Sequence, residues 1–135
     1  MSEFIREAVI STLNDDGSVH LTPLGFRERD DVVVLAPFHP SRTRDNLRAR
    51  GEAVLNFTDD VRVLAGCLTG RREWPTVATT CIAVPRLGDC LAHWELCVTA
   101  IRDDSQRPQF ECRIVGSGLH RPFTGFNRAQ AAVVE

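Results

Sequence analysis

Two stretches that mix apolar and β-branched residues open the chain. Phe4–Leu13 and Val19–Arg27 both have this strand-like character, and the polar run Asn14–Gly17 separates them. Because a glycine at the end of that run can adopt a positive φ, the pattern predicts a β-hairpin. Further on, Val32–Ala36 is apolar without a break, as expected of a strand buried on both faces. The chain is therefore predicted to begin as a three-stranded meander.

A short helix is predicted to interrupt the strands. Pro37–Pro40 breaks the third strand, and Ser41 follows as a suitable N-cap, because its hydroxyl can accept from a free N–H of the first helical turn. The helix is predicted over Arg42–Arg50, and its thin apolar content indicates a surface position. Gly51 stands where a left-handed residue ends many helices. Glu52–Thr58 returns to strand character, which gives the order β-β-β-α-β.

The second half of the chain adds a second hairpin. After a short helix over Val61–Cys67 and a loop-like stretch, Ala92–Ile101 and Gln109–Val115 are predicted to pair, and Gly116–Gly118 is expected to end the second strand. A last helix is predicted over about 124–135. It stops without a C-cap, so truncation of the chain is one interpretation. Together the elements predict a mainly β (β+α) fold. We expect an antiparallel barrel of about six strands with short surface helices, in one domain over residues 1–135.

Composition supports an ordinary globular domain and excludes several classes of function. Apolar residues make up 43% of the 135 residues, charged residues 25%, and the formal net charge is -2. This is not the basic surface that nucleic acid or anionic membrane requires. The chain has no lysine and no tyrosine, which excludes Schiff-base catalysis and tyrosine acids.

The cysteines and the N-terminal residues indicate the cellular compartment and whether disulfides or a metal site are expected. The five cysteines include no C-x-x-C pair, so neither a disulfide framework nor a zinc site is expected. The first residues lack the pattern of a signal peptide, and we expect a cytoplasmic protein with reduced thiols. The cysteines are predicted to be small buried hydrophobic residues: Cys67, Cys81, Cys90, Cys97 and Cys112.

The start of the predicted helix is a candidate anion site. Ser41, Arg42 and Thr43 fall where unpaired N–H groups and the positive end of the helix dipole favour an anion. A guanidinium adds a planar fork that matches phosphate oxygens. From these residues alone, an N-cap followed by solvated arginines also explains the pattern, and both interpretations stay open.

Three motifs in sequence order resemble a known family. They are Thr22-Pro23-Leu24-Gly25-Phe26, then Ser41-Arg42-Thr43-x-x-Asn46-Leu47, then Gly51-Glu52-Ala53-Val54-Leu55-Asn56-Phe57. Their order is similar to that of the flavin reductase-like FMN-binding split β-barrel. The chain as a whole, including its segment His120–Ala129, resembles the family called domain of unknown function 447.

The resemblance implies FMN as cofactor and assigns roles by position. The strand Leu21–Phe26 would line the isoalloxazine, the helix start would bind the phosphate, and the next strand end would approach the ribityl chain or brace the site. The residues implied are Thr22, Gly25 and Phe26 for the ring, Ser41, Arg42, Thr43 and Asn46 for the phosphate, and Asn56 and Thr58 for the ribityl chain. Arg42 replaces the lysine that the reductases often carry, which keeps the charge.

A second cationic cluster lies at the start of the last predicted helix. His120, Arg121, Asn127 and Arg128 could meet the same phosphate, or one across a dimer interface. Capping by Thr124 with solvated arginines is the alternative, and the sequence does not decide between them.

No catalytic constellation is visible in the sequence. His20, His39 and His93 are scattered, which suits a flavoprotein, because the flavin ring carries out the redox step. Trp74 and Trp94 are expected in the core, and a lid that stacks on the flavin is the alternative. We expect an FMN-dependent oxidoreductase or flavin reductase-like protein that acts on an unidentified small molecule as a homodimer with FMN at the interface. A non-catalytic flavin-binding or cofactor-carrying module, or a ligand-free oligomeric scaffold, are the alternatives.

Overall fold

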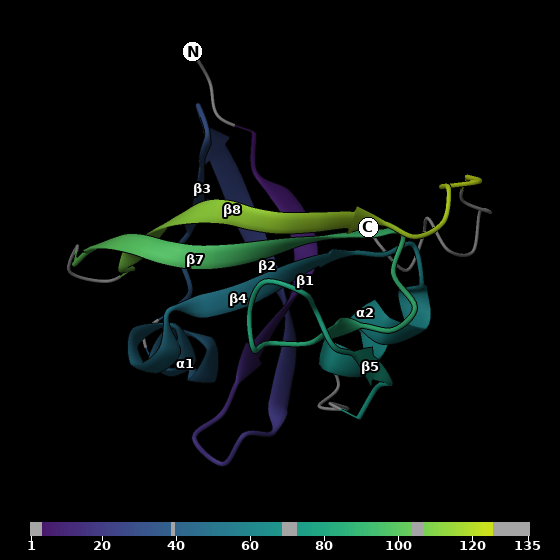
Figure 1. Cartoon of the computed structure of the whole chain (residues 1–135), viewed down its shortest axis with the longest axis horizontal. Coiled ribbons are helices and arrows are strands. Elements are labelled where there is room, and N and C mark those ends of the chain that lie inside the picture. Colours follow the sequence, from purple (N-terminus) through teal and green to yellow (C-terminus); the bar gives the residue numbers. More distant parts are fainter. Residues whose placement is uncertain (1–3, 39, 69–72, 104–106, 126–135) are drawn as a thin grey trace.

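Eight strands and two helices follow one another in the computed structural model, which describes residues 4–38, 40–68, 73–103 and 107–125 (Figure 1). In chain order they are β1 Arg6–Leu13, β2 Val19–Arg29, β3 Val32–Leu35, α1 Arg42–Arg50, β4 Glu52–Phe57, α2 Val61–Leu68, β5 Thr76–Val77, β6 Arg86–Leu87, β7 Ala92–Arg102 and β8 Gln109–Leu119. The hairpin of β1 and β2, the helix α1, the helix α2 and the hairpin of β7 and β8 confirm the sequence predictions.

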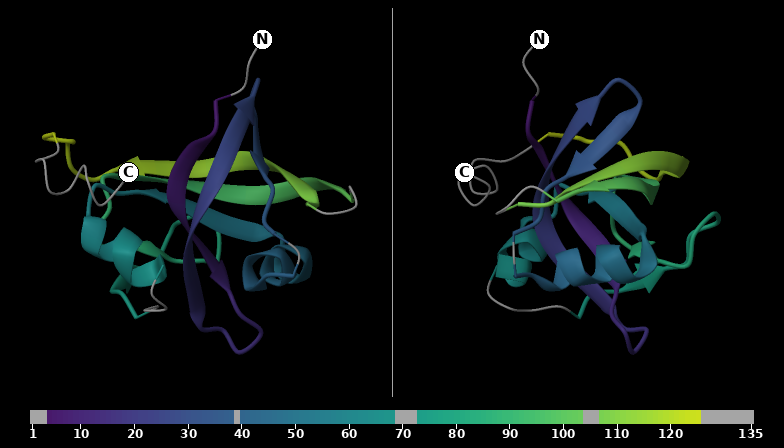
Figure 2. Two further views of the ribbon diagram at one scale, coloured as in Figure 1. Left: turned by 180° about the vertical axis from the view of Figure 1, so that it is seen from behind. Right: turned by 90° about the vertical axis from the view of Figure 1, so that its left-hand side faces the viewer.

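Six strands of the described chain close into an antiparallel barrel in the order β1-β2-β3-β8-β7-β4. β4 pairs back onto β1, with Ile10 opposite Leu55, and this pairing closes the ring. The short strands β5 and β6 form a separate pair outside it. Figures 1 and 2 show α1 and α2 on opposite sides of the projecting β1–β2 hairpin. The predicted mainly β antiparallel barrel with short helices is therefore confirmed.

Local sequence signals set the first hairpin and α1. Gly17 has φ 85° in the β1–β2 turn, and the N–H of Asn14 donates to Ser18 O at 2.9 Å. Ser41 accepts from the N–H of Arg44 at 3.1 Å, as an N-cap does. Gly51 has φ 68° and donates to Leu47 O, which ends the helix in a left-handed residue. Each signal acts within five residues, which explains why the sequence predicts these elements well.

The apolar residues form two layers, one inside the barrel and one outside. Inside, Ile10, Phe26 and Phe110 belong to the main buried cluster. Outside, α2 and the segment 74–91 cover one face of the barrel through Val63 and Leu87. A barrel this small buries apolar surface on both sides of some strands, and this second layer fixes α2 beside β2.

Two glycines lie inside β8 rather than at its end, so the predicted strand end at Gly116–Gly118 is wrong. The strand continues to Leu119 and pairs with β7 along that stretch. A Cβ on Gly116 would lie 2.9 Å from Oε2 of Glu95, and one on Gly118 would lie 2.9 Å from ring atoms of His93 and His120. These glycines are needed for close approach of side chains and not for a turn.

Cysteine burial follows the layers only in part. Cys67, Cys90 and Cys112 are buried, and burial raises the pKa of the Cys112 thiol to about 12. Cys97 is half-buried and Cys81 is exposed, so the prediction of five buried thiols is wrong for Cys81. The segment 74–91 is bound to the barrel at this point by the backbone N–H of Cys81, which donates to Glu95. The thiol of Cys81 remains in solvent.

The two tryptophans pack as predicted, Trp94 against the inner cluster and Trp74 against the outer one. Within the described residues, no helix is long and apolar enough to cross a membrane.

Candidate functional site

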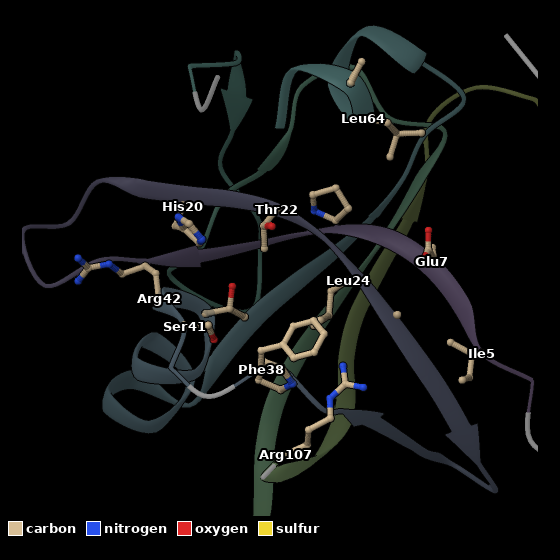
Figure 3. A pocket seen from close by; sticks show the side chains of 15 residues that line it. Ile5, Glu7, His20, Thr22, Leu24, Phe38, Ser41, Arg42, Leu64 and Arg107 are labelled. Atoms are coloured by element: carbon tan, nitrogen blue, oxygen red, sulfur yellow. The ribbon is translucent and has the colours of Figure 1, made fainter. Parts of the chain in front are cut away.

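A cavity of about 690 Å³ lies between the start of α1, the strand β2 and the helix α2 (Figure 3). Its volume is within the range of roughly 300–1,000 Å³ common for small-molecule sites. The lining residues come from six stretches of the chain: Ile5 and Glu7; His20, Thr22, Pro23, Leu24 and Gly25; Pro37 and Phe38; Ser41, Arg42 and Thr43; Leu64 and Ala65; and Arg107.

The helix start forms one end of the cavity. Ser41, Arg42 and Thr43 all line it, and Thr43 is 2% exposed. Arg42 is exposed, and its guanidinium forms no hydrogen bond or ion pair with any described residue. In Figure 3 its side chain extends past His20 toward the β1–β2 turn. Hydrogen bonds from Ser18 hold the pKa of Asp16 in that turn below its usual value, and Arg42 adds to the effect. The cavity thus has one cationic end, built on a helix N-terminus.

The wall of the cavity is a strand with an open edge. β2 pairs with β1 from Val19 to Phe26, but pairing with β3 begins only at Phe26. No other described strand pairs with β2 before that point, so Thr22–Gly25 has one edge without a strand partner. Backbone N–H and C=O groups on such an edge are available to a ligand. Leu64 and Ala65 of α2 also line the cavity.

Five of the predicted site residues that the structure describes, Arg121 included, do not line the cavity. Phe26 points into the barrel core, with ring centroids 5.8 Å from Phe57 and 5.9 Å from Trp94. Nδ2 of Asn46 donates to Thr12 Oγ1 at 3.0 Å and to Asn14 Oδ1 at 2.9 Å, so this amide ties α1 to the first hairpin.

Asn56 and Thr58 also have structural contacts. Asn56 is fully buried; its Nδ2 donates to Val9 O at 2.9 Å, and its Oδ1 accepts from Leu87 N at 2.7 Å. It therefore attaches the covering segment to the barrel. Thr58 Oγ1 accepts from Asp60 N at 3.0 Å, just before α2. Neither residue lines the cavity.

The second cationic cluster is neutralised where the structure describes it. Arg121 donates from Nη2 to Asp59 Oδ1 at 2.8 Å and from Nε to Asp89 Oδ1 at 3.2 Å. The hydrogen bond to Asp59 is the main reason why the pKa of Arg121 is raised. Asn127 and Arg128 lie outside the described residues. The structure therefore does not bring Arg121 to the cavity.

Phe38 and Arg107 line the cavity without any signal in the sequence analysis. The guanidinium of Arg107 lies 4.2 Å from the ring centroid of Phe38. Arg107 precedes β8, and the antiparallel pairing of β8 with β3 carries it back beside Phe38, which follows β3. Residues almost seventy positions apart are brought together by strand register, and no local motif reports that pairing.

A second polar cluster assembles from residues that look scattered in the sequence. His93 Nδ1 and His120 Nε2 are 2.8 Å apart, and His93 Nε2 is 2.9 Å from Oε2 of Glu95. Oε1 of Glu95 accepts from the N–H of Cys81 at 2.7 Å. Glu95 is 1% and His93 6% exposed, whereas His120 is at the surface. The chain of hydrogen bonds thus runs from solvent to a buried carboxylate.

The direction of these hydrogen bonds follows from their chemistry. An ionised carboxylate only accepts, so a neutral His93 donates to Glu95 through Nε2 and accepts from His120 through Nδ1. The ring planes differ by 10° and the centroids are 5.0 Å apart. Since facing nitrogens at 2.8 Å are too close for stacked rings, the imidazoles lie edge to edge.

Electrostatics of this cluster favour an ionised Glu95. Burial alone would raise its pKa, but the hydrogen bonds from His93 and from Cys81 N–H outweigh burial and lower the pKa. Burial, with Arg86 and His93 nearby, lowers the pKa of His120. The cluster is internally satisfied and does not line the cavity. Among the described residues, no group of three His, Cys, Asp or Glu side chains is arranged to hold a metal ion.

The fold and the cavity define an antiparallel barrel protein with a cavity whose one end is a helix N-terminus. The chain belongs to the family of proteins of unknown function 447, whose N-terminal domain model matches residues 6–121. This confirms the resemblance of the sequence to that family. No protein with a curated description matches the chain.

Solved structures resemble the fold along most of the chain. An FMN-bound protein of the same family from Methanosarcina mazei is 20% identical with a TM-score of 0.75, covering 98% of this chain and 72% of that one. The 2-nitrobenzoate 2-nitroreductase of Pseudomonas fluorescens is 23% identical with a TM-score of 0.69, and the flavin reductase of styrene monooxygenase from Pseudomonas putida S12 is 20% identical with a TM-score of 0.69.

Coverage differs between these two enzymes. The match to the nitroreductase covers 84% of this chain but 64% of that enzyme, so the chain spans less than two thirds of it. The match to the flavin reductase covers 86% of this chain and 80% of that one. At these identities the likeness shows a shared fold.

Proposed function

We propose that this protein binds FMN in the cavity between α1, β2 and α2 and acts as a flavin-dependent oxidoreductase. The observation that carries the proposal is the cavity itself. One end is the N-terminus of a nine-residue helix beside an arginine without an ion pair among the described residues, and one wall is an unpaired strand edge. A phosphate suits the helix N-terminus with its arginine, and a ring with amide-like edges suits the unpaired strand edge.

The chain's own residues divide the work of binding. The hydroxyls of Ser41 and Thr43 and the free N–H groups of the first turn of α1 would donate to the phosphate. Arg42 is exposed and rotates at little cost, so its guanidinium can turn from the β1–β2 turn to the phosphate. The backbone of Thr22–Gly25 would meet the isoalloxazine edge. The FMN-bound protein of the same family supports FMN as the ligand.

The oxidoreductase part of the proposal rests on the cofactor. When bound, the flavin supplies hydride or electron transfer. The protein then needs to hold the ring, exclude water with Leu24, Leu64 and Phe38, and position the second reactant. The nitroreductase and the flavin reductase share the fold, which supports turnover.

We also propose that the protein is a cytoplasmic homodimer, in which a second copy covers the open side of the cavity. Apolar side chains near that side are exposed: Phe4 is 81%, Ile5 62% and Phe38 66% exposed. Such residues together indicate a surface that another protein covers. A monomer by sedimentation at micromolar concentration would contradict the dimer.

The absorption spectrum of the purified protein, or of protein reconstituted with FMN, tests the proposed function. We expect a bound flavin spectrum that bleaches with NADH or NADPH under anaerobic conditions and returns with air or an acceptor. A flavin spectrum inert to both donors would favour the cofactor-carrying module. Protein that cannot be loaded with FMN would overturn the proposal and favour the scaffold.

A further inference from the structure

The end of the cavity opposite Arg42 has an arginine of its own. Figure 3 shows Arg107 and Phe38 away from Arg42, and the Arg107 guanidinium lies 4.2 Å from the Phe38 ring centroid. Arg107 is exposed and has no ion pair or hydrogen bond with a described residue. A guanidinium over an aromatic ring keeps its N–H edge free for an anion. The cavity therefore has an arginine at each end, and Glu7 is the one acidic residue among its described lining residues.

A small recess of about 60 Å³ adjoins the cavity beside Arg107. It shares Ile5, Gly25 and Arg107 with the cavity, and Arg27, Val34 and Ala36 complete its lining. Two of the six described lining residues are arginines and none is acidic. Since one water occupies about 30 Å³ in the liquid, the recess has room for a group with two oxygen atoms.

We propose that this recess binds the carboxylate of a planar, aromatic acid that is the second reactant of the flavin. The proposal rests on the proposed function, because FMN would fill the cavity between the two arginines. A guanidinium fork matches the two oxygens of a carboxylate, and Ile5 and Val34 add apolar walls to the recess. Phe38 offers a ring face to the aromatic part of the acid.

The recess is separate from the phosphate site. Ser41 and Thr43 line the cavity but not the recess. Arg107 lines the recess and lies between β7 and β8, far along the chain from α1. A flavin held by its phosphate at α1 carries no second phosphate for Arg107. An anion bound at Arg107 would therefore belong to another molecule.

Titration with benzoate, and with benzamide as its uncharged analogue, tests the proposal. Binding is followed by calorimetry and by the change in flavin absorption, on FMN-loaded and on flavin-free protein. We expect benzoate to bind the loaded protein and benzamide to bind at least tenfold more weakly. Arg107→Gln should lower the affinity for benzoate about tenfold or more, which corresponds to about 1.4 kcal/mol, and leave the affinity for FMN unchanged. Arg107→Lys should retain part of the affinity, because it keeps the charge but loses the fork.

Arg113→Gln is the matched control, since Arg113 is exposed on β8 and lines neither the cavity nor the recess. Equal binding of benzoate and benzamide, no benzoate binding, or equal loss in Arg107→Gln and Arg113→Gln would each overturn the proposal. A loss of FMN affinity in Arg107→Gln would overturn it as well, by placing Arg107 in the flavin site. Failure of FMN to bind would contradict the proposed function only, because benzoate binding to flavin-free protein would still report on the recess.

Discussion

Arg42 and Arg121 both stood as candidates for the phosphate, and their surroundings differ. Arg42 has no ion pair or hydrogen bond with a described residue and lines the large cavity. Arg121 is bound by Asp59 and Asp89 and lies near the His93–Glu95–His120 cluster, which is equally satisfied by its own partners. A cation already paired inside the protein has little to offer a ligand, because binding would first break the existing pair.

The comparison distinguishes a binding region from a stabilising one. Around Arg42, a guanidinium, N–H groups at the helix start and a strand edge have no hydrogen-bonding partner among the described residues. Around His93, a buried carboxylate accepts from two donors, and Gly116 and Gly118 leave room for it and for the rings. We infer that changes near Arg42 alter ligand affinity, whereas changes near Glu95 alter stability.

Glu95→Ala should have the largest effect. It leaves the buried His93 Nε2–H and the part-buried N–H of Cys81 without their acceptor, and we expect a loss of about 3–5 kcal/mol in the free energy of unfolding. Urea unfolding measures it. The matched control is Glu111→Ala, whose ion pair with the exposed Arg102 should contribute less than about 1 kcal/mol. Equal losses in the two variants would contradict the structural role of Glu95.

Arg42→Ala should lower the affinity for FMN roughly ten- to a hundredfold, or by about 1.5–3 kcal/mol in binding free energy, because it removes a charge-assisted contact to the phosphate. Riboflavin, which has no phosphate, should bind as it does to wild type. Fluorescence titration of both flavins checks this. Arg121→Ala should leave FMN affinity unchanged and lower stability only slightly, because its ion pairs are partly exposed to solvent. If Arg121→Ala weakens FMN and Arg42→Ala does not, the two regions have been assigned the wrong way round.

Gly118→Ala should destabilise by about 1–3 kcal/mol, because the added methyl would overlap ring atoms of His93 and His120. Thermal or urea unfolding reports the loss. The double variant Gly118→Ala with His120→Ala should recover part of it by removing one of the two rings. No recovery would mean that the methyl group strains the backbone or His93 alone.

The smallest effect concerns pH. The pKa of His120 is lowered in the folded protein, so the unfolded chain binds more protons and stability falls as pH drops through the ordinary histidine pKa of about 6.5. Unfolding free energies from pH 8 to pH 5.5 should show this slope in wild type and a shallower one in His120→Gln. The pKa of Glu95 is also lowered, but its contribution is lost only as pH falls below the ordinary glutamate pKa of about 4.3. An unchanged slope in His120→Gln would exclude His120 as its source.

Much of the fold and part of the site followed from the sequence. The six barrel strands, both helices and the cavity residues Thr22, Gly25, Ser41, Arg42 and Thr43 were predicted, the site residues with help from the family resemblance. Asn46 was predicted to bind the phosphate, and Asn56 and Thr58 to approach the ribityl chain or brace the site; in the structure the three side chains form hydrogen bonds within the protein. An asparagine motif indicates a specific hydrogen bond but not its partner.

By itself, the sequence determined what depends on neighbours along the chain: the Ser41 cap, the left-handed Gly51, the first hairpin and the strand periodicity. Tertiary structure alone decided the rest. It paired Arg121 with Asp59, joined His93 to His120, and placed Arg107 against Phe38. These contacts depend on the register in which the barrel closes, and that register is the outcome of packing the whole core rather than of any local pattern.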